Sequence, residues 1–425
     1  MLLIFLTVMM SVGFISVQLA REEKLAPASF LYPAAAAAAV FIVLHVVLRI
    51  FMPRADGLIL PITAGLTFMG LVMIDRLDPD LALEQMSWII VAAVCFVLVI
   101  LFFRDYENLA QYKYTWGIAA LLLLASTMVL GKEVNGARLW LQIGSFHFQP
   151  SELAKVALVI FLAAFFAEKH ELLSISTHRA LGIPLPEVKY FVPLLLMWGV
   201  SVLMMIYQKD LGSSLLFFGI FTCMMYAATA RKTYVLVGVA LFALGAYLCY
   251  LGFGHVQVRV LTWLRPFNAA TIQHESYQIS QSLFALSSGG VSGTGLGLGH
   301  PNFIPSVTTD FIFSAVGEEL GLLGAASVVL MYILLVARGI KVALSHRDDF
   351  GKLLAVGLVS IIALQSFIIM GGVTRLIPLT GITLPFMSYG GSSLVANFMV
   401  LGLLMALSHR GATTNVVSLK EGTKR

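Results

Sequence analysis

Charged residues are scarce in this 425-residue chain, where Asp, Glu, Lys and Arg together make up 12% of the residues. Soluble domains carry about a quarter of their residues as charges, so this scarcity excludes an ordinary soluble globule. Hydrophobic residues make up 59% of the chain, and its mean hydropathy is +0.92. The composition therefore predicts a polytopic membrane protein.

Cysteine is scarcer still, with three residues in the whole chain. Cys95, Cys223 and Cys249 all fall in long apolar runs, where a cysteine is most often a small packing residue. We therefore expect neither a disulfide nor a metal cluster from them. The first apolar run also lacks a basic segment before it and a small-residue cleavage site after it, so we expect a retained helix rather than a signal peptide.

Long apolar runs dominate what is present. Crossing a bilayer takes ~20 residues, and about twelve runs approach that length. They lie at about 1–20, 29–52, 57–74, 86–104, 113–131, 152–167, 190–207, 211–229, 233–253, 311–338, 351–372 and 385–409. We expect an all-α bundle of about 12 transmembrane helices.

The basic residues orient this bundle. With the N-terminus in the cytoplasm, most of the 27 Lys and Arg residues fall on the inner side, as the positive-inside rule requires. Both termini are then cytoplasmic, and the longest segment between spans, about 254–310, faces outward. The net charge of +5 fits inner loops that meet anionic lipid, and we expect no nucleic-acid partner.

A soluble domain is missing as well. The inner segments at about 168–189 and 339–352 are too short to bury a core, so any chemistry must use the bundle and its outer loops. The tail at 411–425 is polar and is expected to be disordered. We find no tandem repeat.

The few charges that enter the apolar runs are therefore the first functional candidates. An ionisable group inside a spanning helix costs roughly 2.5–3.5 kcal/mol on insertion scales, so it usually marks a substrate path, a proton path or a buried ion pair. Glu152 and Lys155 are three residues apart and share one helix face, and Arg138 precedes them. They form either a capped helix start with an internal ion pair, or a polar cavity in which Lys155 and Arg138 hold an anionic head group.

The next charged segment, Gln208 to Ser214, leaves room only for a tight outer turn. Asp210 in this turn is either a functional carboxylate or simply the cap of the next helix.

The large outer loop follows, with Arg259 and Arg265 near the membrane and an apolar stretch, Tyr277 to Leu286, suited to the membrane interface. Alternating glycines at 293, 295, 297 and 299 superficially resemble a phosphate-binding loop. They lack the strand-to-helix setting of such a loop, so we expect backbone packing against the bundle instead.

Three carboxylates stand at the next membrane entry: Asp310, Glu318 and Glu319. If a helix begins at Asp310, Glu318 lies about 12 Å deeper and should face a cavity or a cation. If the span begins near Glu319, both glutamates are ordinary interface residues.

The last cluster runs from Gly371 to Ser393, where prolines and glycines interrupt the helical pattern. Broken backbone at membrane depth must be buried in protein or line a water-filled cavity. Ser388, Tyr389, Ser392 and Ser393 would supply hydroxyl groups there, and Arg375 would add a cation.

Four motifs in this order resemble those of the shape, elongation, division and sporulation family of membrane proteins. They are GARLWL with QPSELAK, QKDLGSS, the loop YQISQSLFALSSGGVSGTGLG with TDFIFSAVGEELG, and TGITLPFMSYGGSS. The resemblance covers roughly residues 130–410, and the LPFMSYGGSS string is its most specific part. Family members typically have ten spans, so residues 1–55 would be about two extra N-terminal helices before a core at 56–410.

The resemblance implies a peptidoglycan glycosyltransferase that polymerises lipid II at the outer face of a bacterial cytoplasmic membrane. It also implies a class B penicillin-binding protein and other elongation or division proteins as partners, and a divalent cation, Mg or Mn, as cofactor. Lys155, Arg138, Arg259 and Arg265 could neutralise the pyrophosphate leaving group.

One residue of the family pattern is absent. The family's proposed catalytic Asp follows a loop Pro by three residues, and alignment on Pro266 places Ala269 there. Glu275 is the one carboxylate between Arg259 and Tyr277, and it is either the replacement base or a solvated loop residue. Two alternative functions therefore stay open: a lipid II flippase and an inactive scaffold for the penicillin-binding protein.

Overall fold

The computed structural model describes residues 1–21, 32–134, 137–143, 146–174, 178–180, 183–185 and 210–422, with a few isolated residues between 196 and 208. In this part of the chain, 11 helices are long and apolar enough to cross a membrane. The prediction of an all-α polytopic bundle is thus confirmed. The run expected at 190–207 lies largely outside the described residues.

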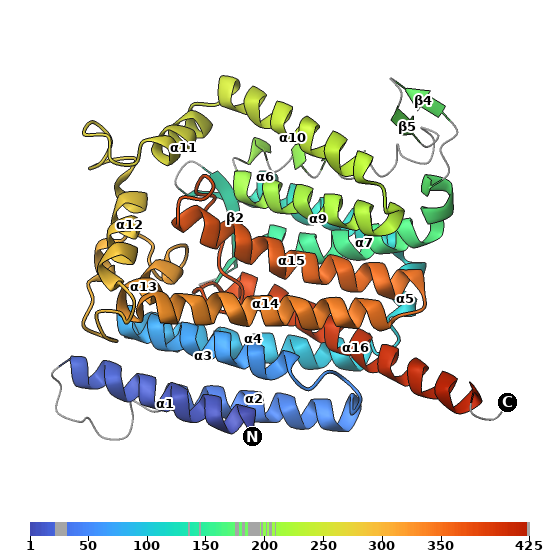
Figure 1. Ribbon diagram of the computed structural model, residues 1–425, viewed down its shortest axis with the longest axis horizontal. Coiled ribbons are helices and arrows are strands. Elements are labelled where there is room, and N and C mark those ends of the chain that lie inside the picture. The colour runs from blue at the N-terminus through green and yellow to red at the C-terminus, as the bar shows by residue number, and fades with distance from the viewer. Residues whose placement is uncertain are drawn as a thin grey trace.

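The long helices follow one another through the whole sequence (Figure 1). Their bounds are α1 Leu2–Ala20, α2 Tyr32–Phe51, α3 Ile59–Leu77, α4 Pro79–Phe102, α6 Lys113–Leu130, α7 Pro150–Ser174, α9 Leu211–Thr229, α10 Lys232–Gly252, α14 Gly321–Ser345, α15 Asp349–Val373 and α16 Gly391–Gly422. Shorter helices are α5 Glu107–Gln111, α11 Gly254–Leu264, α12 Tyr277–Gly289 and α13 Ile312–Glu319, with a 3₁₀ turn at Pro301–Phe303.

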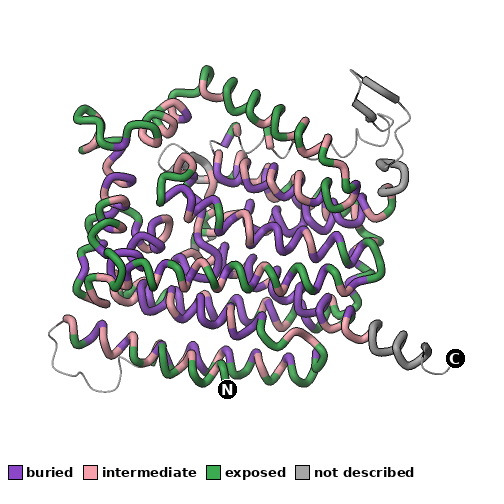
Figure 2. Tube along the Cα trace, viewed as in Figure 1, coloured by how far each residue is buried: buried purple, intermediate pink, exposed green. Residues whose placement is uncertain are grey.

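Burial separates central helices from peripheral ones (Figure 2). The most apolar stretch of α7 is 89% buried and that of α16 is 83% buried, whereas the corresponding stretch of α10 has no buried residue. A helix that is apolar all round belongs in the protein core or in lipid. Helices α7 and α16 therefore form the core together with α3 and α15, and α10 presents its side chains to lipid.

The N-terminal helices α1 and α2 pack against this core as a hairpin along one edge. Phe41 of α2 meets Phe68 of α3 and Phe398 of α16 in edge-to-face contacts, with ring centroids 5.1 and 6.0 Å apart. Ala34, Ala37 and Ala38 are buried, as small residues are wherever helices approach closely in a membrane. The hairpin is a packed part of the bundle.

The span expected at 311–338 differs from the structure, which breaks it into α13 and α14 at Leu320. Gly321 has a φ of +66°, a conformation that favours glycine. A Cβ atom there would lie 2.3 Å from the backbone nitrogen of Gly293. The break therefore exists because the glycine-rich loop packs directly onto the backbone at this point.

The C-terminal part of the chain also differs from expectation at both ends. The last span begins at Gly391 rather than at 385, because Pro385 lies in a turn before it. Helix α16 then continues to Gly422, through most of the tail for which disorder is expected.

Strands appear in two connections between helices. β1 (Lys132–Val134), β2 (Ala137–Ile143) and β3 (Phe146–Phe148) form a three-stranded antiparallel sheet, in which Leu141 pairs with Phe148. β4 (His178–Ala180) and β5 (Ile183–Leu185) form a second small antiparallel pair. The first sheet leads directly into α7 and so positions the start of that helix.

Candidate active site

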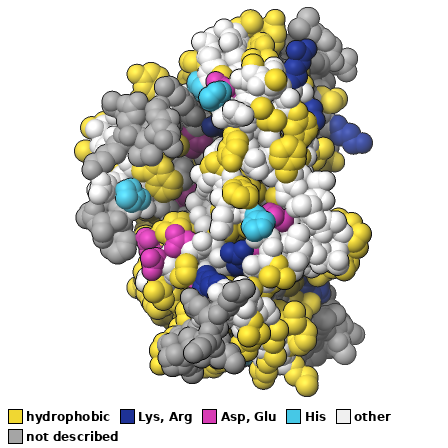
Figure 3. All heavy atoms as spheres, turned by 90° about the vertical axis from the view of Figure 1, so that its left-hand side faces the viewer, with side chains coloured by type: hydrophobic (Ala, Val, Ile, Leu, Met, Phe, Trp, Pro, Cys, Tyr) yellow, Lys and Arg dark blue, Asp and Glu magenta, His cyan; other side chains and the backbone are white. Residues whose placement is uncertain are grey.

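Most of the residues singled out from the sequence gather at one end of the bundle, on the left in Figure 1. We call it the loop end; it carries the segments 131–149, 253–311 and 374–390. Viewed onto this end, acidic, basic and histidine side chains lie among apolar and neutral ones (Figure 3). The loop end is therefore where the site must be built.

Glu152 and Lys155 form the ion pair that their spacing suggests. The Lys155 Nζ lies 2.5 Å from the Glu152 carboxylate and 2.7 Å from the Gln365 side-chain oxygen. Lys155 is only 1% exposed. The Gln365 amide donates in turn to the Thr383 carbonyl at 2.9 Å, and the Thr383 hydroxyl donates to Ser393 at 2.7 Å. The buried charge is thus part of a continuous polar network that links α7, α15 and α16.

Asp210 stands where α9 begins. Its carboxylate accepts the Ser213 backbone N–H at 2.9 Å and the Ser213 hydroxyl at 2.6 Å. It is therefore the helix cap that the sequence allowed as one reading. It is also buried and interacts electrostatically with Arg259 and Glu152, and burial raises its pKa despite the bonds from Ser213 and the charge of Arg259.

Arg259 joins Asp210 to a second carboxylate. Its guanidinium interacts electrostatically with both Asp210 and Asp310, and it donates to the Thr380 carbonyl at 3.1 Å. Burial raises the pKa of Asp310 to about 6, although the Thr309 hydroxyl and the Arg259 charge act in the opposite direction. Burial therefore brings the pKa of Asp310 closer to neutral pH than that of an ordinary carboxyl group.

The backbone around Asp310 is held by the turn at residues 384–390, which we call the Ser388 turn. The Tyr389 N–H donates to the Thr308 carbonyl at 2.9 Å. The Ser388 hydroxyl donates to the Thr309 carbonyl and accepts the Leu384 N–H. The Ser388 turn, which lies about 80 residues later in the sequence, thus fixes Thr308 and Thr309, the two residues immediately before Asp310.

The hydroxyl groups of Ser392 and Ser393 also form hydrogen bonds within the protein. The Ser392 hydroxyl accepts the Gln149 N–H at 3.0 Å, and the Ser393 hydroxyl accepts the Asn397 amide at 3.2 Å. Burial and a hydrogen bond with Glu84 raise the pKa of Tyr389. These residues organise the walls of the site.

Glu318 and Glu319 are buried, at 7% and 0% exposure, and they hold the glycine-rich loop. Glu318 accepts the His300 N–H at 2.8 Å, and Glu319 accepts the Gly297 N–H at 2.9 Å. Arg76 of α3 bonds to Glu319 at 3.1 Å and to the Gly299 carbonyl at 3.0 Å. The loop is therefore packed against the bundle by carboxylates, in a setting unlike that of a phosphate-binding loop.

The remaining candidates lie apart from this network. Glu275 is exposed and borders a cavity of about 30 Å³ shared with Trp263, Gln278 and Leu379, which is room for about one water molecule. Arg265 is exposed. The side chain of Arg138 is outside the described residues.

Three further polar residues belong to the site although none of them was among the candidate residues from the sequence. Gln85 and Gln365 are buried amides in spanning helices, and Thr380 has a buried hydroxyl without a hydrogen-bond partner among the described residues. The two glutamines could have been found from the sequence, because each is a polar residue within an apolar run. Thr380 gives no such signal.

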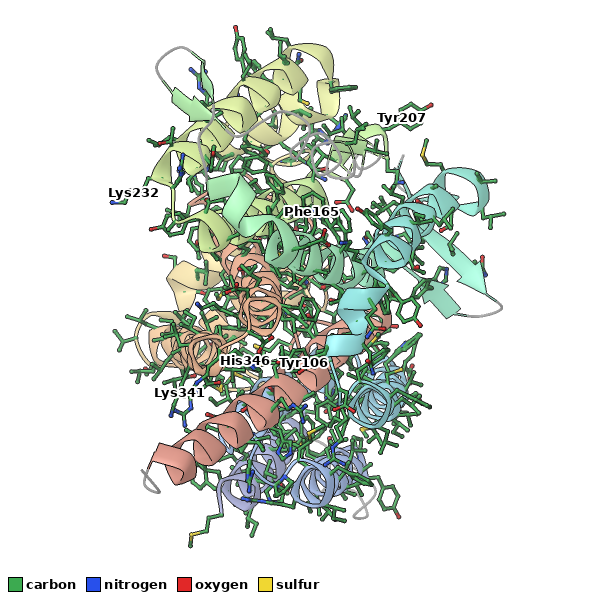
Figure 4. All side chains as sticks on the ribbon, turned by 90° about the vertical axis from the view of Figure 1, so that its right-hand side faces the viewer. Tyr106, Phe165, Tyr207, Lys232, Lys341 and His346 are labelled. Carbon is green, nitrogen blue, oxygen red and sulfur yellow. The ribbon has the colours of Figure 1, made fainter. Side chains whose placement is uncertain are left out.

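The opposite end of the bundle carries a different buried cluster (Figure 4). The Tyr106 hydroxyl donates to Asp348 at 2.9 Å, and His346 lies 3.2 Å from both and 3.0 Å from the Leu407 carbonyl. Although burial alone would raise it, the bonds from His346, Gly351 and Tyr106 lower the pKa of Asp348 to about 2. This cluster ties the C-terminal end of α14 and the N-terminal end of α15 to the middle of α16.

Comparison with known proteins gives consistent matches over most of the chain. The family model for FtsW, RodA and SpoVE, described as "Cell cycle protein", matches residues 57–413. The peptidoglycan glycosyltransferase RodA of Mycobacterium tuberculosis is 45% identical over 379 residues, which cover 86% of this chain and 80% of that protein. A probable peptidoglycan glycosyltransferase FtsW of Geobacter metallireducens is 34% identical, over 84% of this chain and 95% of that protein.

Solved structures agree with this. A chain of a peptidoglycan synthase complex, described as coordinating polymerization and crosslinking, superposes with a TM-score of 0.68 at 27% identity, covering 84% of this chain and 98% of that one. The rod shape determining protein RodA of Thermus thermophilus gives a TM-score of 0.59 at 28% identity, covering 84% and 97%.

Proposed function

Since the chain belongs to the FtsW, RodA and SpoVE family and is by homology a peptidoglycan glycosyltransferase, we propose that its substrate is lipid II and that Asp310 is its general base. The reaction centre in this proposal is a polar network of Glu152, Lys155 and Asp210, which are buried, and Arg259 and Asp310, which are half-buried. The observation that carries the proposal is the Asp310 carboxyl group beside the half-buried Arg259 guanidinium, with a pKa that burial raises to about 6.

The chemistry needs one proton acceptor and a stabilised leaving group. A sugar hydroxyl of one lipid II molecule attacks the anomeric carbon of the other substrate, and the bond from that carbon to the pyrophosphate oxygen breaks. The electron pair leaves with the lipid pyrophosphate, and the hydroxyl proton passes to the Asp310 carboxylate. Lys155 and Arg259 supply positive charge where negative charge develops on the leaving group.

Asp310 is favoured over Glu275 as the base because of its surroundings. A base works best when its pKa lies close to the working pH, and burial brings Asp310 to that range. Glu275 is exposed and borders a cavity too small for a sugar. Glu275 stays the second candidate, because a loop can close over a substrate.

A divalent cation fits the same residues. The five charged residues of the network contain three carboxylates and two cations, so a bound pyrophosphate would add negative charge to a site that already has an excess of it. Among the described residues no three His, Cys, Asp or Glu side chains are placed to hold a metal ion. Mg²⁺, however, commonly uses one or two carboxylates together with substrate phosphates.

The donor atoms for such a cation are hard oxygens. Asp210 supplies a carboxylate, and the Thr380 hydroxyl is buried without a partner among the described residues. A Cβ atom at Gly212, two residues from Asp210, would lie 3.2 Å from the Thr380 Cβ. These residues would hold Mg or Mn, which when bound neutralises charge on the pyrophosphate.

The partner in this proposal is a class B penicillin-binding protein, and a transmembrane helix of that partner would lie against α14. A groove of about 900 Å³ runs along the exposed face of α14. Gly290, Gly317, Ala325 and Ala326 line it, and small residues permit close helix contact in membranes. Ala326→Trp should abolish co-purification of the partner, whereas Leu344→Trp, at the far end of α14, should not.

The loop end would face outward in a bacterial cytoplasmic membrane, with both termini in the cytoplasm. A flippase would need a polar route that continues to the other end of the bundle. At that end the hydrogen bonds of Tyr106 and His346 hold the helices together, which favours the glycosyltransferase over the flippase. Labelling of single cysteines in intact cells, placed at the loop end and near a terminus, tests this orientation.

The decisive comparison of bases is Asp310→Asn against Glu275→Gln in an assay of glycan-strand formation from labelled lipid II. Loss of a general base lowers the rate by roughly 10²–10⁴-fold. We expect this loss in Asp310→Asn and a rate close to that of the unchanged protein in Glu275→Gln. The opposite result would move the base to Glu275.

A further inference from the structure

Gln85 of α4 makes an unusual pair of hydrogen bonds with the Ser388 turn. Its side chain is only 2% exposed. The amide nitrogen donates to the Ser388 carbonyl at 3.2 Å, and the amide oxygen accepts the Gly390 N–H at 3.3 Å. A glutamine carries both a donor and an acceptor in one plane, so it pairs with the turn much as a neighbouring strand would.

The turn that Gln85 holds is the one that holds the segment before Asp310. Tyr389, between the two residues bonded to Gln85, donates its N–H to the Thr308 carbonyl at 2.9 Å. Ser388 donates its hydroxyl to the Thr309 carbonyl. A chain of hydrogen bonds therefore runs from α4 through the turn to the residue next to Asp310.

The same turn also packs closely against helices α3 and α14. A Cβ atom at Gly70 of α3 would lie 2.3 Å from the Met387 carbonyl oxygen. The Tyr332 hydroxyl of α14 donates to the Pro385 carbonyl at 2.5 Å. Phe386 has a φ of +65°, and a non-glycine residue keeps such a conformation only when its surroundings enforce it. Helices α3 and α14 therefore leave the turn little room to move toward them. If the turn shifts, Thr308 and Thr309, which are bonded to it, shift as well.

We propose that Gln85 is a positioning residue for the reaction, which fixes the Asp310 carboxylate through the Ser388 turn. The proposal rests on the proposed role of Asp310 as the base. Gln85 itself touches neither substrate nor reacting atoms. A misplacement of about 1 Å at a reacting group can cost roughly 10²-fold in rate.

The test uses Gln85→Met, which removes both hydrogen bonds at similar volume, and Gln85→Asn, which keeps both groups but is one methylene too short. The control is Thr63→Val, a buried change on α3 whose hydroxyl bonds to the Ile59 carbonyl of its own helix. We expect both Gln85 variants to lower kcat for strand formation by about tenfold or more. Lipid II binding and the control variant should match the unchanged protein.

A second readout separates positioning from general loss of structure. Hydrogen exchange at the Tyr389 and Gly390 amides should accelerate in the Gln85 variants, while exchange in α7 stays unchanged. In a double-mutant cycle on kcat, Gln85→Met and Ser388→Ala should be far from additive, because both act through one turn. If Gln85→Met fails to fold, Gln85→Asn decides.

Unchanged kcat in both Gln85 variants would overturn the proposal, as would additive effects in the cycle or unchanged exchange at Tyr389 and Gly390. The exchange measurement needs no catalysis. It therefore tests the link from Gln85 to the turn even if Asp310→Asn proves fully active, in which case the role of Asp310 fails while the structural link stands.

Discussion

Replacing Arg259 should move the acidic limb of the pH profile of kcat/KM, because Arg259 is the cation that opposes the rise in the Asp310 pKa. With Arg259 present, the pKa of Asp310 is about 6. Loss of a nearby opposite charge raises a carboxyl pKa by roughly one to three units, and one unit is the conservative choice. The limb should then move from about pH 6 to about pH 7 in Arg259→Gln.

The magnitude is easy to measure. Only the ionised carboxylate accepts a proton, so at pH 6 the unchanged protein should keep roughly half of its plateau kcat/KM, and Arg259→Gln roughly one tenth of its own plateau. The position of the limb does not depend on the height of the plateau, so a general loss of activity in the variant does not confuse the result.

The assay is strand formation from labelled lipid II between pH 5 and 9, with Arg265→Gln as the matched control. Arg265 is an exposed arginine of the same loop and should leave the limb in place. A limb that stays at about pH 6 in Arg259→Gln, or one that moves equally in Arg265→Gln, would refute the assignment of Asp310 as the titrating base.

Three further predictions concern stability and packing. Lys155→Met leaves Glu152 buried without its partner and should cost about 3–5 kcal/mol, whereas the double change with Glu152→Gln should recover much of this in detergent thermal unfolding. Gly70→Ala should cost about 1–3 kcal/mol because its new Cβ meets the Met387 carbonyl, while Gly245→Ala, with open space around it, should be neutral or stabilising by up to about 1 kcal/mol. Arg21→Gln removes a contact of 3.9 Å with Asp75, whose neighbour Arg76 bonds to Glu319. We expect faster amide exchange in residues 293–299. Unchanged exchange would show that the N-terminal hairpin does not stabilise the glycine-rich loop.

The sequence predicts the parts of this site that depend on local spacing. The ion pair of Glu152 and Lys155 follows from three-residue spacing on a helix, and the cap at Asp210 follows from its place before an apolar run. The association of Asp210, Arg259 and Asp310 does not follow from spacing, because the three residues lie about fifty residues apart in the sequence. Only the tertiary fold brings them together.

Two other features could not be predicted from the sequence, because they also depend on contacts between distant segments. The break between α13 and α14 lies in a continuous apolar run, and it depends on contact with Gly293 about thirty residues earlier. The twin hydrogen bonds of Gln85 depend on a turn about 300 residues later in the chain. An amide in an apolar helix signals a buried partner, but the sequence does not identify that partner.

The absence of an Asp at position 269 gives the account its sharpest test, because a family pattern would place the base there. The measurement is strand formation from labelled lipid II by the purified protein with the proposed penicillin-binding partner and Mg²⁺, comparing the unchanged chain with Asp310→Asn. We predict polymer from the unchanged chain despite Ala269, and a rate of strand formation lower by roughly 10²-fold or more from Asp310→Asn. Equal amounts of polymer from both would contradict the account, and lipid II binding without polymer from either would indicate a scaffold or a flippase instead.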